Sequence, residues 1–331
     1  MDIPAKIKKI DSTLKTLSEH EHACRLCPRQ CSIDRERRSG YCSAGKDASL
    51  SYSGLHFGEE PVLSGYEDCH KELKNFSGPS SGSGTIFFTG CHLKCLYCQN
   101  HQISWGNQGS EVSITGLARK ILEIQKKGAL NINIVSPTHM ILPLLSALKK
   151  AYEEGLSLPL VYNSCGYERD VILRNLEGII DIYLPDIKYF SPLLSQKLSG
   201  VSDYFDQTKR AILEMSRQQP DLILDKNKTA QRGLIIRHLV LPGQVNDSIK
   251  ILNWIKKNIP NSCGLSLMSQ FYPCFKTPVE FRRKISPAEY EEVLKIAQKL
   301  EFEQIFIQPE LFFDDRHVIP DFKSENPFRW E

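Results

Sequence analysis

From about residue 84 onward, short apolar segments alternate with longer segments whose apolar residues recur at helical spacing. The short segments are rich in β-branched and aromatic residues and end at turn-forming residues, which is typical of buried strands. We predict strands at residues 85–89, 131–135, 158–162, 179–184, 234–239, 265–268 and 304–308. We predict helices between them at residues 117–127, 141–154, 206–217 and 247–258.

A further helix is expected directly after Ser286. Ser286 can cap the first turn, Pro287 suits the first helical position, and Glu289 completes a capping box. The alternation of helices with strands that are apolar throughout indicates an α/β fold with a parallel sheet covered by helices. Six or seven repeats favour a barrel or partial barrel, and a doubly wound sheet is the alternative.

Polar residues follow six of the predicted strands. These positions include Cys91, Thr138, His139, Asn163, Asp186, His238 and Gln270. In a parallel barrel the carboxyl ends of the strands share one rim, and active sites lie at that rim. The recurrence of polar groups at six strand ends therefore predicts a functional rim.

The first 83 residues have a different character, with an amphipathic helix followed by a short, turn-rich segment that contains cysteines. The apolar residues at helical spacing are Ile3, Ile7, Ile10, Leu14 and Leu17. We therefore divide the chain into an N-terminal helix and cysteine-rich segment (1–83), a barrel (84–310) and a C-terminal tail (311–331).

The composition adds limits on location and partners. The chain has 331 residues, a mean hydropathy of -0.31 and a net charge of +3 from 42 basic and 39 acidic residues. This near-balance argues against a general attraction to nucleic acid or an anionic membrane. No segment approaches the roughly 18 apolar residues of a membrane span, and the N-terminus lacks the apolar region of a signal peptide. We therefore expect a cytoplasmic protein.

Eleven cysteines without an export signal are the informative exception. In a reducing compartment structural disulfides are rare, so clustered cysteines indicate metal binding or redox chemistry. Seven of the eleven fall in two clusters. The scattered ones are expected to act as small buried apolar side chains; they are Cys69, Cys165, Cys263 and Cys274.

The strongest motif is the C-x3-C-x2-C spacing of Cys91, Cys95 and Cys98. Three thiolates on one loop can converge on one small object, and such thiolates hold iron–sulfur clusters. Three cysteines for four irons leave one iron without a protein ligand, and an open coordination position is where a substrate binds. Zinc is the alternative, but the loop offers no certain fourth ligand beyond the nearby His92 and His101.

A second motif, C-x2-C-x3-C-x10-C, is formed by Cys24, Cys27, Cys31 and Cys42. Four thiolates within nineteen residues can close a tetrahedral metal site. Three interpretations stay open for this N-terminal cysteine quartet: a structural zinc ion, a second iron–sulfur cluster for electron entry, or thiols without metal.

The three-cysteine loop resembles the signature of the radical S-adenosylmethionine (SAM) superfamily, in which an aromatic residue, here Tyr97, usually precedes the third cysteine. The resemblance covers about residues 24 to 310 and narrows to the branch related to pyruvate formate-lyase activating enzymes. The segments that carry this narrower resemblance are residues 84–88, 98–100, 131–133, 137–139, 181–189 and 237–243.

The resemblance implies a partial (β/α)6 TIM-like barrel with a [4Fe–4S] cluster on Cys91, Cys95 and Cys98. It implies that the reduced cluster cleaves SAM to a 5′-deoxyadenosyl radical, which abstracts a hydrogen atom from the substrate. Activating enzymes of this branch act on a glycine of a partner protein, a glycyl radical enzyme. Their electrons come from an external one-electron donor such as flavodoxin or ferredoxin.

The sequence departs from the superfamily pattern after the second predicted strand. Members often carry a Gly-Gly-Glu-like stretch there to hold the amino group of SAM, whereas here the stretch is Ser136-Pro137-Thr138-His139. Thr138, His139 or backbone carbonyl groups are the candidates to replace it.

The candidate SAM-binding residues are Tyr97, Thr138, His139, Asn163, Asp186 and His238. Each has a structural alternative. Asp186 can form an ion pair with Lys188 in a loop, Asn163 can cap a turn, and a histidine at a strand end can simply be hydrogen-bonded. No residue is assigned as catalytic.

The sequence is also compatible with other functions. One is a radical SAM enzyme that acts on a small molecule, and another is a non-catalytic iron–sulfur or zinc protein for electron transfer or scaffolding. A zinc-dependent nucleic-acid-binding module is disfavoured by the net charge of +3. The three-ligand loop and the polar rim favour an enzyme. A protein substrate is preferred because of the resemblance to activating enzymes, and the lack of a long insertion able to form a lid agrees with it.

Overall fold

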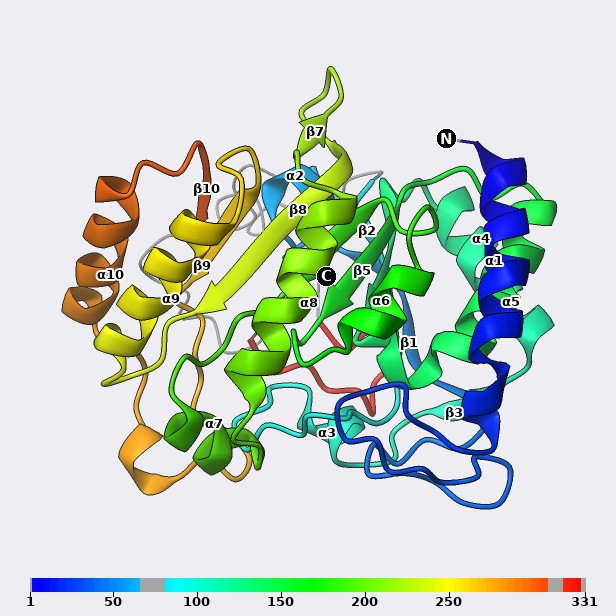
Figure 1. Ribbon diagram of the computed structural model, residues 1–331, viewed down its shortest axis with the longest axis horizontal. Helices are drawn as coiled ribbons and strands as arrows, with labels where there is room; N and C mark the ends of the chain where they lie inside the picture. The colour runs from blue at the N-terminus through cyan, green and yellow to red at the C-terminus, as the bar shows by residue number, and fades with distance from the viewer. Residues whose placement is uncertain (1, 66–80, 309–317, 329–331) are drawn as a thin grey trace.

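The computed structural model describes residues 2–65, 81–308 and 318–328. Its centre is a ten-stranded sheet (Figure 1). Seven neighbouring strands run parallel, and in spatial order they are β2 (Ser83–Phe88), β4 (Asn131–Val135), β5 (Leu160–Ser164), β6 (Ile182–Pro185), β8 (Ala230–Leu239), β9 (Gly264–Met268) and β10 (Gln304–Ile307). Among these seven strands the order never reverses, as it would at the switch point of a doubly wound sheet. The predicted α/β partial barrel is therefore confirmed.

The barrel is open, since β10 lies at one end of the strand order and β3 (Ser110–Val112) at the other. Between β3 and β2 lies β1 (Ala48–His56), which is antiparallel to both. The short β7 (Ile223–Leu224) pairs with β8. The sequence analysis does not predict these three antiparallel strands. A signal for β1 exists, because Ala48, Leu50 and Tyr52 alternate with serines.

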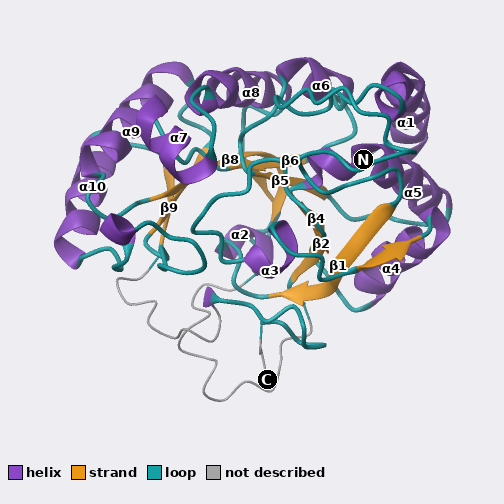
Figure 2. Ribbon diagram, turned by 90° about the horizontal axis from the view of Figure 1, so that it is seen from below, coloured by secondary structure: helices purple, strands orange, loops and turns teal. Residues whose placement is uncertain are grey.

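Helices cover one face of the sheet, and Figure 2 shows most of them as an arc outside the strands. The helices are α1 (Ile3–Leu17), α2 (Pro61–Ser64), α3 (His101–Ser104), α4 (Ile114–Lys126), α5 (Ile141–Glu153), α6 (Asp170–Asn175), α7 (Pro192–Ser199), α8 (Tyr204–Gln218), α9 (Val245–Asn258) and α10 (Pro287–Lys299). Short 3-10 turns are η1 (Ser18–Glu21), η3 (Pro137–Met140) and η4 (Val279–Phe281). In Figure 2, α2 and α3 lie inside the arc.

All the predicted strands and helices occur, although several ends differ. β8 begins at Ala230, because its first residues pair with β7, a strand that the pattern does not reveal. The helix after Ser286 begins as predicted. The Ser286 hydroxyl accepts a hydrogen bond from the backbone of Glu289 (3.3 Å), and the Glu289 carboxylate accepts one from the backbone of Ser286 (2.9 Å).

The N-terminal helix α1 packs against α5. Lys6 Nζ lies 2.5 Å from Asp181 Oδ2 in a largely buried ion pair, and the Thr13 hydroxyl donates to the carbonyl oxygen of Asn175 (2.7 Å). These contacts fasten the segment that precedes the barrel. The domain boundaries stay a prediction, and much of the predicted tail, like Cys69, lies outside the described residues.

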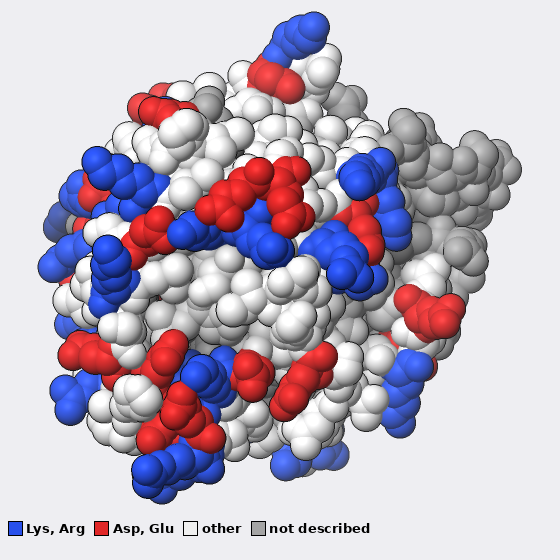
Figure 3. Space-filling view, turned by 90° about the vertical axis from the view of Figure 1, so that its right-hand side faces the viewer, with Lys and Arg blue, Asp and Glu red and all other residues white. Residues whose placement is uncertain are grey.

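Charged side chains of both signs are mixed on the side of the molecule shown in Figure 3. On α5, Lys150 and Glu154 form an ion pair of 3.3 Å at helical spacing. The described residues on this face form no broad basic area of the kind that binds nucleic acid. In the described part of the chain, no helix is both long enough and apolar enough to cross a membrane.

Candidate active site

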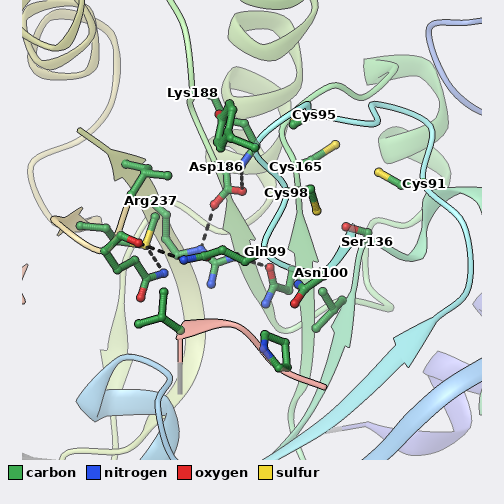
Figure 4. A pocket seen from close by; sticks show the side chains of 18 of the residues that line it. Cys91, Cys95, Cys98, Gln99, Asn100, Ser136, Cys165, Asp186, Lys188 and Arg237 are labelled. Carbon is green, nitrogen blue, oxygen red and sulfur yellow. Dashed lines mark hydrogen bonds and ion pairs between the residues drawn. The ribbon is translucent and has the colours of Figure 1, made fainter. Parts of the chain in front are cut away.

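A cavity of about 260 Å³ lies at the carboxyl ends of the parallel strands (Figure 4). Six successive strands of the sheet contribute to its lining. One lining residue from each strand or from the loop after it is Cys91 (β2), Ser136 (β4), Asn163 (β5), Asp186 (β6), Arg237 (β8) and Met268 (β9). The polar strand ends therefore converge on one space.

The loop after β2 brings the three cysteines into this cavity. Its second residue, Gly90, has a φ of +90°. A Cβ atom at this position would clash with the carbonyl oxygen of Cys42, so the chain needs glycine here for the turn and for the close approach. Beyond this turn, Cys91, Cys95 and Cys98 all line the cavity.

Each of the three sulfur atoms accepts a hydrogen bond. The backbone of Leu93 donates to Cys91 Sγ at 3.4 Å. The Ser199 hydroxyl donates to Cys95 Sγ, and the Ser104 hydroxyl donates to Cys98 Sγ, both at 3.2 Å. Hydrogen bonds of this kind stabilise thiolates and tune the potential of a cluster that they hold.

The spacing of the three sulfur atoms fits a group larger than one ion. A tetrahedral zinc ion with Zn–S bonds of about 2.3 Å holds its sulfurs roughly 3.8 Å apart. In the described part of the chain, two groups of side chains bring three ligand atoms within 4.8 Å of one another, and neither includes Cys91, Cys95 or Cys98. The loop therefore fits an iron–sulfur cluster better than a zinc ion.

Arg237 connects three polar side chains of the cavity. Its Nε donates to Asp186 Oδ1 (3.0 Å), its Nη2 to Asn163 Oδ1, and its Nη1 to Glu59 Oε2 (3.4 Å). The second oxygen of the Asp186 carboxylate, Oδ2, accepts a hydrogen bond from Lys188 Nζ at 2.5 Å. The network joins strand ends of the barrel to the loop that follows β1.

Two carboxyl groups of this network have opposite pKa shifts. Burial opposes ionisation of Asp186, but Lys188 and Arg237 outweigh it and hold the pKa of the Asp186 carboxyl below its ordinary value. Burial raises the pKa of Glu59 to about 7, against the opposing effect of Arg237. The cavity thus offers a fixed carboxylate and two cations, which suits a ligand with both an ammonium and a carboxylate group.

Three of the six predicted SAM-binding residues line the cavity: Tyr97, Asn163 and Asp186. Tyr97 is buried, and its hydroxyl accepts a hydrogen bond from the hydroxyl of Tyr189 (2.8 Å). Its ring lies 5.4 Å from that of Phe271. Their assignment as SAM ligands stays a prediction.

Thr138 and His139 are not among the lining residues. The Thr138 hydroxyl donates to Glu168 Oε1 (2.6 Å), and His139 Nε2 is 2.9 Å from the carbonyl oxygen of Thr89. Burial lowers the pKa of His139 to about 3, so its ring is neutral and donates to that carbonyl. His139 thus holds backbone next to the cavity, and Thr138 holds the side chain of Glu168.

His238 is also behind the cavity wall. Its Nδ1 is 2.7 Å from the carbonyl oxygen of Ile187, and its Nε2 is 2.9 Å from the hydroxyl of Ser248. Burial lowers its pKa to about 4. The neutral ring therefore donates to the Ile187 carbonyl and accepts from Ser248, and its predicted contact with SAM stays untested.

The stretch that departs from the superfamily pattern meets the cavity through Ser136, whereas Pro137, Thr138 and His139 do not line it. Ser136 has a φ of +49°, which is uncommon for a residue other than glycine, and its backbone donates to the carbonyl oxygen of Asn163 (2.7 Å). Strained backbone at a cavity is typical of functional sites.

One buried group resembles a metal site, since ligand atoms of His92, Cys165 and Glu168 lie within 4.8 Å of one another. These atoms already have hydrogen-bond partners. His92 Nε2 is 2.9 Å from the carbonyl oxygen of Tyr167 and 3.4 Å from Cys165 Sγ, and Glu168 Oε1 accepts from two hydroxyls at 2.6 Å, one of them that of Thr138. We therefore assign this group to support of the loop and place no metal there.

Two parts of the cavity wall are not predicted from the sequence. Glu59 reaches the wall because β1 pairs with β2. Val318, Pro320 and Phe328 also line the cavity, so the rim is partly covered by the C-terminal segment and not by an insertion after a strand. The aromatic residues of this segment are a signal for packing, since Phe328 lies 5.5 Å from Phe87.

The N-terminal cysteine quartet lies around a second, separate cavity, which Arg35 and His139 also line. The quartet is therefore a distinct site next to the three-cysteine loop.

The fold and the three-cysteine cavity define a class of protein. A family model described as the radical SAM superfamily matches residues 85–255. The chain belongs to this superfamily, and membership implies a [4Fe–4S] cluster and SAM as cofactors.

The chain is also similar to individual proteins and to one solved structure. The uncharacterized protein MJ0674 of Methanocaldococcus jannaschii is 31% identical over 295 residues, which cover 86% of this chain and 76% of that protein. Pyruvate formate-lyase 1-activating enzyme of Escherichia coli (strain K12) is 24% identical over 169 residues, which cover 49% of this chain and 62% of that enzyme. Among solved structures, Streptococcus suis SuiB bound to precursor peptide SuiA aligns with a TM-score of 0.45 and 12% identity, over 66% of this chain and 46% of SuiB.

Proposed function

We propose that this protein is a radical SAM enzyme of the activating type, which abstracts a hydrogen atom from a glycine of a partner protein. The observation that carries the substrate class is the partial similarity to pyruvate formate-lyase 1-activating enzyme, 24% over 169 residues. A cavity bordered by the three cysteines supports an enzyme over a scaffold, because a protein that only holds a cluster needs no such space.

Cys91, Cys95 and Cys98 would hold the cluster and leave one iron open to SAM. When bound, the cluster and SAM supply the 5′-deoxyadenosyl radical that removes the hydrogen atom. In this proposal Asp186 offers its carboxylate to the ammonium group of SAM. Lys188 and Arg237 keep the Asp186 carboxylate ionised. The same two cations would form ion pairs with the carboxylate of SAM.

The other predicted residues divide into two roles. Tyr97 and Asn163 form the cavity wall, where Tyr97 excludes water beside the cluster. Thr138, His139 and His238 act as positioning residues through the groups to which they are hydrogen-bonded. The electrons would come from an external one-electron donor such as flavodoxin or ferredoxin, and the reducing cytoplasm is the compartment that we propose.

The test is an anaerobic reaction of the reduced protein with SAM and candidate glycyl radical enzymes. We expect 5′-deoxyadenosine, together with an electron paramagnetic resonance (EPR) signal of a radical on the partner protein. Cys95→Ala is the matched control and should give neither product. Strong stimulation of 5′-deoxyadenosine by a metabolite alone, with no radical on any protein, would contradict the activating role and leave the radical SAM assignment intact.

A second candidate is a radical SAM enzyme with a small-molecule substrate. The observation in its favour is the limited space. The cavity of about 260 Å³ is partly covered by Val318, Pro320 and Phe328, and ligand sites of about 300–1,000 Å³ are usual for small molecules. The same experiment distinguishes the two candidate functions, because it shows whether a radical forms on a partner protein.

A further inference from the structure

The N-terminal cysteine quartet encloses an interior space. Cys24, Cys27 and Cys42 are buried and Cys31 is half-buried. Gly40 forms one side of the space, where an added Cβ atom would lie 3.2 Å from Cys31 Sγ and 3.6 Å from Cys42 Sγ. The sulfurs of Cys31 and Cys42 therefore lie on either side of Gly40, and all four cysteines line one space although they are spread over nineteen residues.

A buried cation points toward these sulfurs. Arg35 is 4% exposed, and its Nη1 lies 3.8 Å from Cys24 Sγ. Its other contacts are the carbonyl oxygens of Gly45 (2.8 Å) and His139, and among the described residues no carboxylate pairs with it. A buried guanidinium needs a negative group for neutralisation. Thiolates on a metal supply that charge, whereas four neutral thiols do not, so the metal-free interpretation is disfavoured.

The sulfur spacing separates the two metal-bound interpretations. A zinc ion with four Zn–S bonds of about 2.3 Å requires all its sulfurs to lie roughly 3.8 Å apart. Among the described residues, the groups with three ligand atoms within 4.8 Å include no cysteine of the quartet. Among the described residues, no such group includes Cys91, Cys95 or Cys98 either, where the superfamily holds its cluster. The quartet thus lacks the close sulfur spacing of a zinc site, as the three-cysteine loop does, and this likeness favours a cluster.

Cys42 links the two cysteine sites through the backbone. Its carbonyl oxygen accepts a hydrogen bond from the backbone of Cys91 (3.2 Å). Beside this contact, Lys94 Nζ donates to the hydroxyl of Ser43 (2.9 Å). One peptide unit and one hydrogen bond thus join a ligand residue of one site to a ligand residue of the other, which is a short path for an electron.

We propose that Cys24, Cys27, Cys31 and Cys42 hold a second iron–sulfur cluster that passes electrons to the cluster on the three-cysteine loop. One electron enters from an external one-electron protein donor, and one electron leaves toward the loop. The second cluster returns to its starting oxidation state, and no covalent bond to the protein forms or breaks. Four protein thiolates leave no open iron, so this site does not bind SAM. The inference holds whichever substrate class is correct.

Metal analysis tests the identity of the site. Protein that is purified anaerobically and reconstituted with iron and sulfide should contain about eight irons per chain and almost no zinc. The triple variant Cys91→Ala/Cys95→Ala/Cys98→Ala should keep about four irons and an EPR signal on reduction. Cys263→Ser, a change at a buried cysteine outside both clusters, should keep the full iron content. About one zinc and no iron in the triple variant would overturn the proposal.

The relay has a separate test that does not depend on catalysis. In a variant with all four quartet cysteines changed to Ser, reduction of the remaining cluster is followed by EPR. We expect reduction by flavodoxin to slow by at least about tenfold, while reduction by dithionite changes little. Equal rates with flavodoxin would refute the relay. If this variant does not fold, Arg35→Gln is the substitute, and it should lower the reduction potential of the second cluster and leave that of the first in place.

Discussion

The three-cysteine loop and the N-terminal cysteine quartet are neighbours with different surroundings. The loop faces a cavity of about 260 Å³ that contains ionised side chains. The space of the quartet is lined by apolar residues, Gly40, Tyr41, His139 and two arginines, Arg29 and the buried Arg35. Three ligands beside an open cavity suit a site where a substrate meets the metal, and four ligands in an enclosed space suit a site that only holds or transfers charge. Ligand number and access together therefore distinguish the two sites.

The largest effect is expected at the loop. Cys95→Ala should reduce SAM cleavage below detection, because one of only three protein ligands is lost. Cys165 lines the same cavity, yet we expect Cys165→Ala to keep the full iron content of the loop. Iron analysis and 5′-deoxyadenosine formation measure both variants. Loss of the cluster in Cys165→Ala would make this residue a fourth ligand and remove the contrast between an open and a closed site.

Asp186→Asn should weaken SAM binding by about 30- to 150-fold, since it removes a charged partner worth roughly 2–3 kcal/mol. The iron content should not change, because Asp186 contacts Lys188 and Arg237 and not a cysteine sulfur. Equilibrium binding of SAM under anaerobic conditions measures the effect. Asp206→Asn, at an exposed position of α8, is the control. Unaltered affinity in Asp186→Asn would show that the charged part of the cavity serves another ligand.

Gly90→Ala should disturb the contact between the two sites. The new Cβ atom clashes with the carbonyl oxygen of Cys42 at a residue with positive φ, and we expect a loss of about 2–4 kcal/mol in folding free energy. Gly155→Ala is a matched control, because Gly155 also has positive φ but no atom lies within 4 Å of the added carbon. Thermal unfolding should separate the two variants. Equal losses would mean that backbone strain alone, and not the approach of Cys42, explains the requirement at Gly90.

The smallest effect is expected for Tyr97→Phe. The change removes one hydroxyl that accepts from Tyr189 and keeps the ring against Phe271, so stability should fall by about 1 kcal/mol. SAM cleavage should change less than about threefold, because the proposed task of the ring is to exclude water. A loss of activity far beyond this range would show that the hydroxyl itself takes part in binding or proton placement.

Much of the fold and the centre of the site could be predicted because their signals are local. The apolar strands between amphipathic helices predict a parallel sheet, the residues around Ser286 predict a helix start, and the spacing of Cys91, Cys95 and Cys98 predicts a cluster. The antiparallel strand β1 was not predicted. Its apolar residues do alternate with polar ones, but Ser and Gly separate them and the segment has no continuous apolar run. The start of β8 was predicted four residues too late because its partner β7 is only two residues long.

What the sequence by itself determined is the periodicity of each element, the ligand spacing within each loop and, through them, the superfamily. The tertiary structure decided which distant side chains meet. Pairing of β1 with β2 brings Glu59 to Arg237, and the turn at Gly90 brings Cys42 to Cys91. It also decided that His238 faces Ser248 and not the cavity. The physical reason is that periodicity and ligand spacing are set by neighbours along the chain, whereas these contacts depend on the packing of many residues that are remote in sequence.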